Sequence, residues 1–417
     1  MPPDGATVDE DGMTPLHSGR FRLLWCSSLA SAGAQGMERT TTAWLALLAA
    51  HNPLGVGIVF AARNLPSLLF GLMSGTIADR VERPRLLLGV AGVAAVLMAL
   101  LSWLSSGGNI QTWQVAAIAF ATGCFQVFDT PARQALVMDT VPRALATSAV
   151  ALNAFATRLA MAIGAFAAGL LIPAVGVSRC YLVVAGVYVA SGTLMSTLHV
   201  ARGTRTAASH PPFREALGDA ARLIVQVPAV RTLMIAGIAC EVFAFSHGSA
   251  LPTVAQSVLR AGASGLGTLN SAVAIGGTTA VLLLSLIPGR VRREPLLGAA
   301  FVVYGLSLLG VSSARNLATA AAILVVTGLC AGAFDVLQQT LIQLAVPEEQ
   351  RGRAVGIWVL GLGSAPVGNL EMGTLIATFG APVALLINGC LTLASAAVLL
   401  VRAPQYRLAL RTRGETA

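Results

Sequence analysis

Long apolar runs recur along the chain and are separated by short polar stretches. A transmembrane helix needs about 20 consecutive, mainly apolar residues, and each run is about that long or longer. The twelve runs fall at 22–50, 54–79, 86–106, 112–138, 144–174, 178–200, 229–258, 266–288, 295–313, 317–345, 353–379 and 381–402. The pattern predicts an all-α polytopic membrane protein with twelve transmembrane helices.

One long polar interruption, at 201–228, divides the runs six and six. We predict an N-terminal six-helix bundle over 21–200 and a C-terminal six-helix bundle over 229–402. The interruption is predicted to be a central cytoplasmic loop. Residues 1–20 lack the basic start and short apolar core of a signal peptide, so they are predicted to be a disordered cytoplasmic tail, and 403–417 a second cytoplasmic tail.

Basic residues gather on one side of this predicted topology. The chain has 27 arginines, no lysine and a formal net charge of +9. Nineteen arginines fall in the tails and in the loops on their side, and three fall in the opposite loops. Such an excess marks the cytoplasmic side of a membrane. Both termini are therefore predicted to be cytoplasmic, and no nucleic-acid partner is needed to explain the charge.

The two halves of the chain repeat weakly. A shift of 205 residues superposes eight identities in the window 122–150. A shift of 210 places Gly57 on Gly267, and a shift of 204 places Gly169 on Gly373. These matches predict two six-helix bundles related by a pseudo-two-fold axis normal to the membrane, an arrangement found in one large transporter fold.

Composition excludes several kinds of chemistry. A chain without lysine has neither a Walker A loop nor a Schiff-base lysine. The six cysteines are scattered without a CxxC pair and are predicted to be small buried hydrophobes. The five histidines form no ligand motif. We therefore predict no enzymatic activity, no cofactor and no metal site, and we expect a monomer in the lipid bilayer.

The sequence GTIADRVER stands at 75–83, between the second and third runs. Asp79 can cap a neighbouring helix and attract arginines, and Gly75 permits a close approach of another helix. Arg80 and Arg83 would alone serve as a membrane anchor, but an anchor needs no aspartate or glycine at fixed spacing. The segment resembles the G-x-x-x-D-R-x-x-R signature of the major facilitator superfamily. That resemblance implies a gating motif made of Gly75, Asp79, Arg80 and Arg83.

Three further segments and Arg158 resemble one branch of that superfamily, which includes the enterobactin exporter and macrolide and drug efflux proteins. The segments are FRLLW at 21–25, LPSLL at 65–69 and FDTPARQ at 128–134. The resemblance implies a secondary active transporter of the bacterial inner membrane. It would export a small organic molecule (a siderophore, drug or metabolite) by alternating access, driven by the proton gradient. A proton-coupled importer is the alternative, and a membrane enzyme or a non-transporting receptor fits less well.

Ionisable residues inside the apolar runs are costly in lipid and indicate functional sites. For proton coupling we predict Glu38 as the primary site, Glu241 as the second and His247 as a modulator, because desolvated carboxylates can exchange protons. A shift of 209 lays Glu38 on His247, so both are expected to project toward the same outer part of a cavity. The alternative is that Glu38 pairs with Arg63.

The predicted lining of the substrate cavity is Arg63, Asp129, Arg158 and Glu371. Arg158 would suit an anionic or polar substrate, and the alternative is a structural salt bridge between helices. Asp129 stands four residues before Arg133, so the alternative is that the two form an ion pair within one helix. Arg39 points about 100° away from Glu38 and is expected to extend to the outer headgroups.

Overall fold

A computed structural model describes residues 14–50, 52–198, 218, 222–287 and 291–402, and it omits the side chains of 72–80, 143, 349 and 352. Within these residues every regular element is a helix, which confirms the predicted fold class. Most of the predicted tails and central loop lies outside the described residues. At the edge of the first tail the prediction of disorder is wrong, because a 3-10 turn forms at Pro15–His17 and a helix begins at Gly19.

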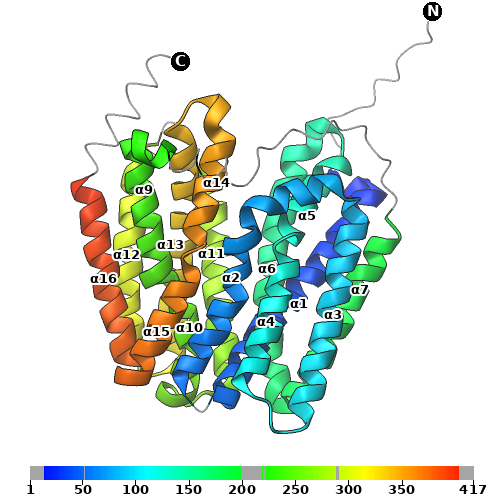
Figure 1. The fold of residues 1–417 in the computed structure, drawn as a ribbon, viewed down its shortest axis with the longest axis vertical. Helices are drawn as coiled ribbons and strands as arrows, with labels where there is room; N and C mark the ends of the chain where they lie inside the picture. The colour runs from blue at the N-terminus through cyan, green and yellow to red at the C-terminus, as the bar shows by residue number, and fades with distance from the viewer. Residues whose placement is uncertain (1–13, 51, 199–217, 219–221, 288–290, 403–417) are drawn as a thin grey trace, which may run out of the picture.

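The N-terminal bundle is formed by helices α1 to α7, which pack mainly against one another (Figure 1). They are α1 (Gly19–Ala50), α2 (Pro53–Arg80), α3 (Arg83–Ser106), α4 (Thr112–Gln126), α5 (Asp129–Asp139), α6 (Ala146–Val175) and α7 (Val177–Ser196). Helices α4 and α5 together occupy the fourth predicted run. All six runs of this half are therefore helical, with ends within a few residues of those predicted.

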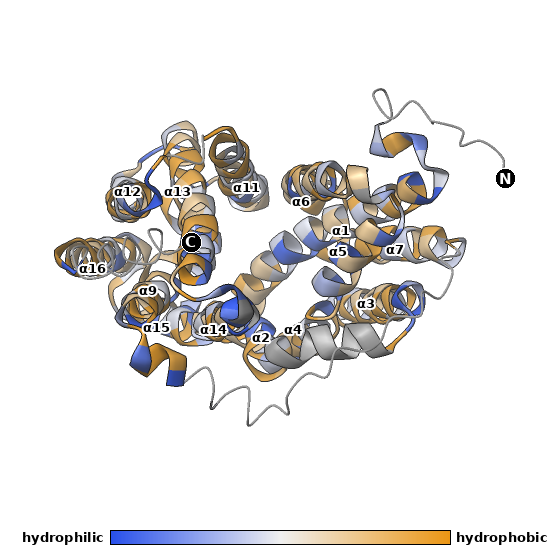
Figure 2. Cartoon of the chain, turned by 90° about the horizontal axis from the view of Figure 1, so that it is seen from above, coloured by the Kyte–Doolittle hydropathy of each residue, from blue (hydrophilic) through white to orange (hydrophobic). Residues whose placement is uncertain are grey.

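The C-terminal bundle contains the remaining helices and appears as a second group when the molecule is viewed from above (Figure 2). They are α9 (Pro228–Ala239), α10 (His247–Thr253), α11 (Gly262–Leu286), α12 (Arg293–Ser313), α13 (Leu317–Leu344), α14 (Arg351–Leu362), α15 (Ala365–Phe379) and α16 (Ala381–Val401). Two π-helical segments, Cys240–Phe245 and Val254–Val258, flank α10. Together with α9 and α10 they form the seventh predicted run.

The direction of the chain defines two ends of the molecule. Helix α1 begins and α16 ends at the upper edge of Figure 1, which we call the terminal end, and the connections α1–α2 and α15–α16 lie at the opposite end. Ten segments of the described chain are long and apolar enough to cross a membrane. Helix α1 and the pair α14–α15 run beside them between the same two ends. The chain is a multi-pass membrane protein.

Two runs break in the middle. Val127–Phe128 separate α4 from α5, and Gly363–Ser364 separate α14 from α15. Pro131 follows Val127 by four residues, and Pro366 likewise follows the last residue of α14 by four. Proline has no N–H, and its ring clashes with the carbonyl four residues before it. Both breaks therefore follow from the local sequence.

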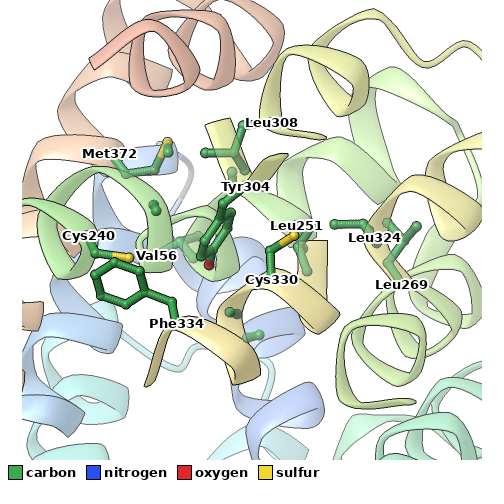
Figure 3. Packing of buried hydrophobic residues seen from close by; sticks show 14 of the residues in the cluster. Val56, Cys240, Leu251, Leu269, Tyr304, Leu308, Leu324, Cys330, Phe334 and Met372 are labelled. Atoms are coloured by element: carbon green, nitrogen blue, oxygen red, sulfur yellow. The ribbon is translucent and has the colours of Figure 1, made fainter. Parts of the chain in front are cut away.

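Buried aromatic side chains fill the C-terminal bundle (Figure 3). Tyr304 and Phe334 are almost completely buried, and both lie in one large apolar cluster with Cys240 and Cys330. The prediction that the cysteines are buried is correct for half of them. Cys180, Cys240 and Cys330 are buried, Cys124 is half-buried, and Cys26 and Cys390 are exposed.

Candidate functional site

The two bundles meet through two pairs of glycines near the opposite end. Gly57 of α2 faces Gly373 of α15, and Gly169 of α6 faces Gly267 of α11. A Cβ atom on Gly267 would lie 2.6 Å from the Cα of Gly169, and one on Gly57 would lie 2.5 Å from the Asn369 carbonyl oxygen. Only glycine fits such backbone contacts. The repeat relates one contact to the other, since it aligns Gly57 with Gly267 and Gly169 with Gly373.

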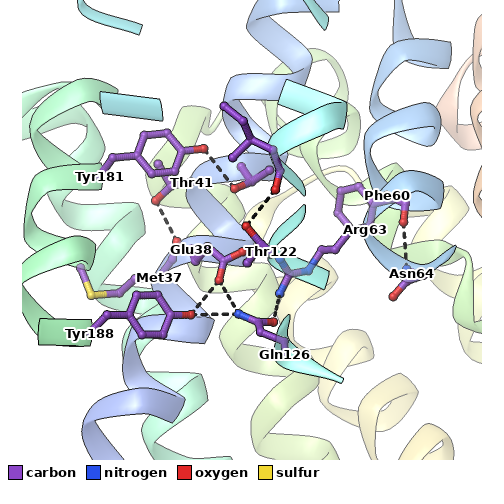
Figure 4. Close-up of polar contacts among 12 residues, drawn as sticks. Met37, Glu38, Thr41, Phe60, Arg63, Asn64, Thr122, Gln126, Tyr181 and Tyr188 are labelled. Carbon is purple, nitrogen blue, oxygen red and sulfur yellow. Dashed lines mark hydrogen bonds and ion pairs between the residues drawn. The ribbon is translucent and has the colours of Figure 1, made fainter. Parts of the chain in front are cut away.

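Glu38 lies at the centre of a polar network inside the N-terminal bundle (Figure 4). Its side chain is 1% exposed and forms an ion pair with Arg63 of α2. Gln126 of α4 donates a hydrogen bond to Glu38 Oε2 at 2.9 Å, and the Tyr188 hydroxyl of α7 donates one to the same oxygen at 2.8 Å. Arg63 Nη2 also donates to Gln126 Oε1 at 2.7 Å. The pairing with Arg63 that the sequence left open is therefore present.

The four residues of this network lie at similar depth. Counted from the opposite end of each helix at 1.5 Å per residue, they stand about 15 to 21 Å into the bundle. Gln126 and Tyr188 were not predicted as functional residues from the sequence. In the sequence, the feature that could have identified them is a hydrogen-bonding side chain inside an apolar run, at a distance from the helix end similar to that of Glu38.

His247 is enclosed by its own bundle in a similar way. It is 4% exposed, its Nδ1 lies 2.8 Å from the Ala244 carbonyl oxygen, and the Tyr304 hydroxyl lies 3.3 Å from the same nitrogen. Glu38 and His247 therefore do not project toward one shared space, as the sequence analysis expected. Each is turned into the bundle that supplies its hydrogen-bond partners.

Arg158 lies on the face of α6 that is turned toward the C-terminal bundle. One turn further along α6, the Ala162 carbonyl accepts a hydrogen bond from Ser271 of α11 at 2.9 Å, and Gly169 contacts α11 on nearly the same face. The Arg158 side chain is exposed. Its charge interacts with that of Asp335 in α13 of the other bundle.

Glu241 is a second carboxylate of the C-terminal bundle near Asp335. It lies in the π-helical segment Cys240–Phe245, and its charge interacts with that of Asp335. Among the described residues, Arg158, Asp335 and Glu241 form no ion pair within 4.0 Å. No role was predicted for Asp335 from the sequence, although a carboxylate inside an apolar run could have marked it as a functional residue. π-Helical turns are frequent at functional sites.

Asp129 does not line the space between the bundles. It is 6% exposed and accepts a hydrogen bond from Arg133 Nε at 2.8 Å, the intrahelical pair that the spacing allowed. Arg133 Nη1 also donates to Ser28 of α1 at 3.3 Å. Helix α5 packs within the N-terminal bundle, so this pair joins α5 to α1. The predicted place of Asp129 in the substrate cavity is therefore corrected.

Glu371 also faces a neighbour in its own bundle. Asn388 of α16 donates a hydrogen bond to Glu371 Oε2 at 3.1 Å and contacts Ser246 Oγ at 3.2 Å. Glu371 is half-buried, and Asn388 is fully buried. The contact links α15 and α16 rather than the two bundles. Of the residues predicted to line a substrate cavity, only Arg158 is placed between the bundles.

The predicted gating motif spans the terminal end of α2 and the start of α3. The side chains of Gly75, Asp79 and Arg80 lie outside the described residues. Arg83 Nη1 donates to Asp139 Oδ2 at 2.5 Å, which ties the start of α3 to the last residue of α5. Asp139 is a partner that the motif alone did not reveal. No group of three or more histidines, cysteines or acidic residues in the described part of the chain could hold a metal ion.

Comparison with known proteins identifies relatives over most of the chain. A family model described as "transmembrane secretion effector" matches residues 10–412. The staphyloferrin A transporter of Staphylococcus aureus is 25% identical over 340 residues, which cover 81% of this chain and 84% of that protein. The multidrug efflux pump Tap of Mycolicibacterium fortuitum is 24% identical over 389 residues, with 87% and 90% covered.

Solved structures share the arrangement of helices. The nucleoside transporter NupG superposes with a TM-score of 0.75 at 10% identity, over 92% of this chain and 98% of that chain. A bacterial homologue of the human lysosomal transporter Spinster, in an inward-facing and unoccupied conformation, gives a TM-score of 0.66 at 13% identity, with 96% and 98% covered. At these identities the likeness concerns the fold alone.

Proposed function

Because the chain belongs to the transmembrane secretion effector family of the major facilitator superfamily, we propose that it is a proton-coupled exporter of a small organic molecule. Membership makes the chain a transporter and not an enzyme. Family membership does not specify the direction of transport, proton coupling or the substrate, and these are the parts that we propose. Two relatives are named for staphyloferrin A transport and multidrug efflux, which supports a siderophore, a drug or a metabolite as the substrate.

The group formed by Arg158, Asp335 and Glu241 carries this proposal. Charged side chains at mid-depth in a membrane protein are energetically unfavourable in lipid. They are found where they face a polar pathway and have a function there. The group includes residues of both bundles, and within the described part of the chain its members form no ion pair within 4.0 Å. A substrate or a proton that enters between the bundles can therefore change the balance of charge that holds the two halves in place.

The contacts between the bundles support alternating access in the bacterial inner membrane. The glycine pairs Gly57–Gly373 and Gly169–Gly267 close the opposite end. Arg158 lies on the terminal side of the α6–α11 contact and is exposed. With the termini in the cytoplasm, this is an inward-facing conformation. We propose that the motif at 75–83 forms the gate that closes the terminal end in the other state.

We propose Glu241 as the carboxylate that couples transport to protons. In this conformation Glu38 is bonded to Arg63, Gln126 and Tyr188, so a proton could reach it only after that network opened. Glu241 has no ion partner to displace among the described residues, and it lies near Asp335. Protonation of one carboxylate would relieve the repulsion between the two. His247 and Glu38 are then structural groups of their bundles.

Transport direction and substrate are tested together in whole cells. A deletion strain and its parent are compared by metabolomics of the medium and by growth on a drug panel. Export predicts that the substrate is depleted from the medium of the deletion strain, or that the strain becomes sensitive to a drug. Loss of uptake from the medium would instead support the alternative, a proton-coupled importer.

Coupling is tested in proteoliposomes with a compound identified in that way. Glu241→Gln is expected to abolish accumulation driven by an imposed pH gradient, while exchange of the compound without a gradient persists. Glu348→Gln, a change at an exposed surface pair with Arg351, is the matched control. Accumulation by Glu241→Gln at the rate of the control would show that Glu241 is not the coupling residue.

A further inference from the structure

Arg39 faces a direction that no helix of its own bundle occupies. Glu38 points to α2, α4 and α7, Gly36 abuts the Met161 carbonyl of α6, and Thr41 contacts Cys180 of α7 at 3.3 Å. At about 100° per residue, Arg39 stands about 100° from Glu38 on one side and about 60° from Gly36 on the other. It therefore lies in the sector left open between α2/α4 and α6.

The C-terminal bundle packs against α1 next to Arg39. The residue after Arg39, Thr40, accepts a hydrogen bond from Asn270 of α11 at 3.2 Å, and α1 also contacts α10. The Arg39 side chain is exposed although α1 lies inside the molecule. It therefore borders the space between the bundles. The expectation that Arg39 extends to the outer headgroups is corrected, because the helices of both bundles surround this part of α1.

No ion pair involves Arg39 within the described chain. The adjacent carboxylate, Glu38, attracts Arg39 but is already paired with Arg63, and no described residue lies within ion-pair distance, 4.0 Å, of Arg39 with an opposite charge. Arg158 differs, because the carboxylate near it, Asp335, belongs to the other bundle and is not held in an ion pair within the described residues. Arg39 stands about 17 Å from the opposite end of its helix and Asp335 about 27 Å from the same end of α13, so the two are at different depths. An unpaired guanidinium at this depth would be stabilised by an anion that is not part of the described chain, such as a bound ligand.

We propose that Arg39 recognises a carboxylate on the transported molecule, so that the substrate class is an organic acid. A guanidinium holds a carboxylate through two parallel N–H···O bonds, which gives both charge and orientation. One unpaired positive charge matches one carboxylate. This inference rests on the proposed transport function, because it places the substrate between the bundles at the level of the closed end.

The test is ligand binding to the purified full-length protein in detergent, followed by thermal unfolding. The probes are 2-naphthoate, phenylacetate and succinate, each compared with its uncharged amide. We expect at least one acid to raise the unfolding temperature of the wild type while its amide does not. Arg39→Gln is expected to weaken that acid's binding by about tenfold or more, the loss of a hydrogen bond to a charged group, and Arg39→Lys by less.

Arg315→Gln is the matched control, because Arg315 is exposed and without an ion pair within 4.0 Å but lies in the loop between α12 and α13. It should bind the acid as the wild type does. Without ligand, Arg39→Gln should unfold at the wild-type temperature, since no described partner is lost. The inference is overturned if no acid is preferred to its amide, or if Arg39→Gln binds the acid like the control.

The proposed function can fail separately. If acids bind through Arg39 but no compound is moved across the membrane by a pH gradient, the role of Arg39 in binding is supported and the proposed proton-coupled export is rejected. If a compound is exported and the wild type shows no preference for acids, the proposed export is supported and the proposed role of Arg39 is wrong.

Discussion

At the scale of the residue, Glu38 and Arg39 show how one step along a helix changes the environment of a charge. Glu38 is almost completely buried, and its carboxylate accepts hydrogen bonds from three side chains on three other helices. Arg39 is exposed and turned toward the other bundle. Substitution of Glu38 should therefore affect stability, and substitution of Arg39 should affect ligand binding.

The first prediction concerns Glu38→Gln. The change leaves Arg63 buried without its counter-charge, and breaking a buried pair from one side destabilises by about 3–5 kcal/mol. We expect a lower unfolding temperature of the detergent-solubilised protein. Arg63→Gln should have a similar effect, and the double variant should be more stable than the sum of the two losses predicts. Wild-type stability of Glu38→Gln would contradict the structural role of the pair.

At the scale of the element, the contact between the bundles depends on helices that approach through glycine. A Cβ atom on Gly267 would meet the Cα of Gly169 at 2.6 Å and the Ala165 carbonyl oxygen at 2.9 Å. Both are backbone atoms, so no side chain can move aside to make room. Helices α6 and α11 must separate if Gly267 acquires a side chain.

The second prediction is that Gly267→Ala shifts the protein toward the state that is open at the opposite end. Gly89→Ala is the control, because a Cβ atom there would meet no atom within 4 Å. The measurement is the distance between spin labels on cysteines introduced at two exposed positions, 179 in the first turn of α7 and 260 in the connection before α11. We expect a longer distance for Gly267→Ala alone.

Spin labelling requires that the exposed Cys26 and Cys390 are first replaced by serine. Unchanged distances in Gly267→Ala, with a fold as stable as that of the control, would show that the glycine contact does not hold the opposite end closed.

At the scale of the whole molecule, the distribution of arginine fixes the predicted orientation in the membrane. Nineteen arginines lie on the side of the termini and three on the other side. Both ends of the folded chain, the start of α1 and the end of α16, lie at one end of the molecule (Figure 1). The bias therefore applies to one surface of the protein, which the positive-inside rule places in the cytoplasm.

The third prediction tests this orientation with reporter fusions. Green fluorescent protein fused after Ala417 should fluoresce, and alkaline phosphatase fused there should be inactive, because the latter folds only outside the cytoplasm. Phosphatase fused after Ser106, in the connection at the opposite end, should be active. The reverse pattern would invert the topology, and with it the inward-facing assignment of this conformation.

Much of the architecture follows from the sequence alone. In lipid, every backbone N–H and C=O group must be bonded within its own segment, so long apolar runs have to be helices. The runs at 54–79 and 317–345 accordingly match α2 and α13 within a few residues. The repeat also aligned Gly57 with Gly267 and Gly169 with Gly373, and these four glycines form the contacts between the bundles.

The tertiary structure alone decided which charges meet. Whether Glu38 faces Arg63 depends on the rotation of α1 and α2 about their axes, and a rotation of about 100° would exchange Glu38 with Arg39. An apolar helix looks much the same from every side, so its sequence encodes this rotation weakly, whereas packing against the neighbouring helices fixes it. For this reason the sequence identified Asp129 and Glu371 as charges inside apolar runs. It could not show that each faces a neighbour in its own bundle, or that Arg39 lies between the two bundles.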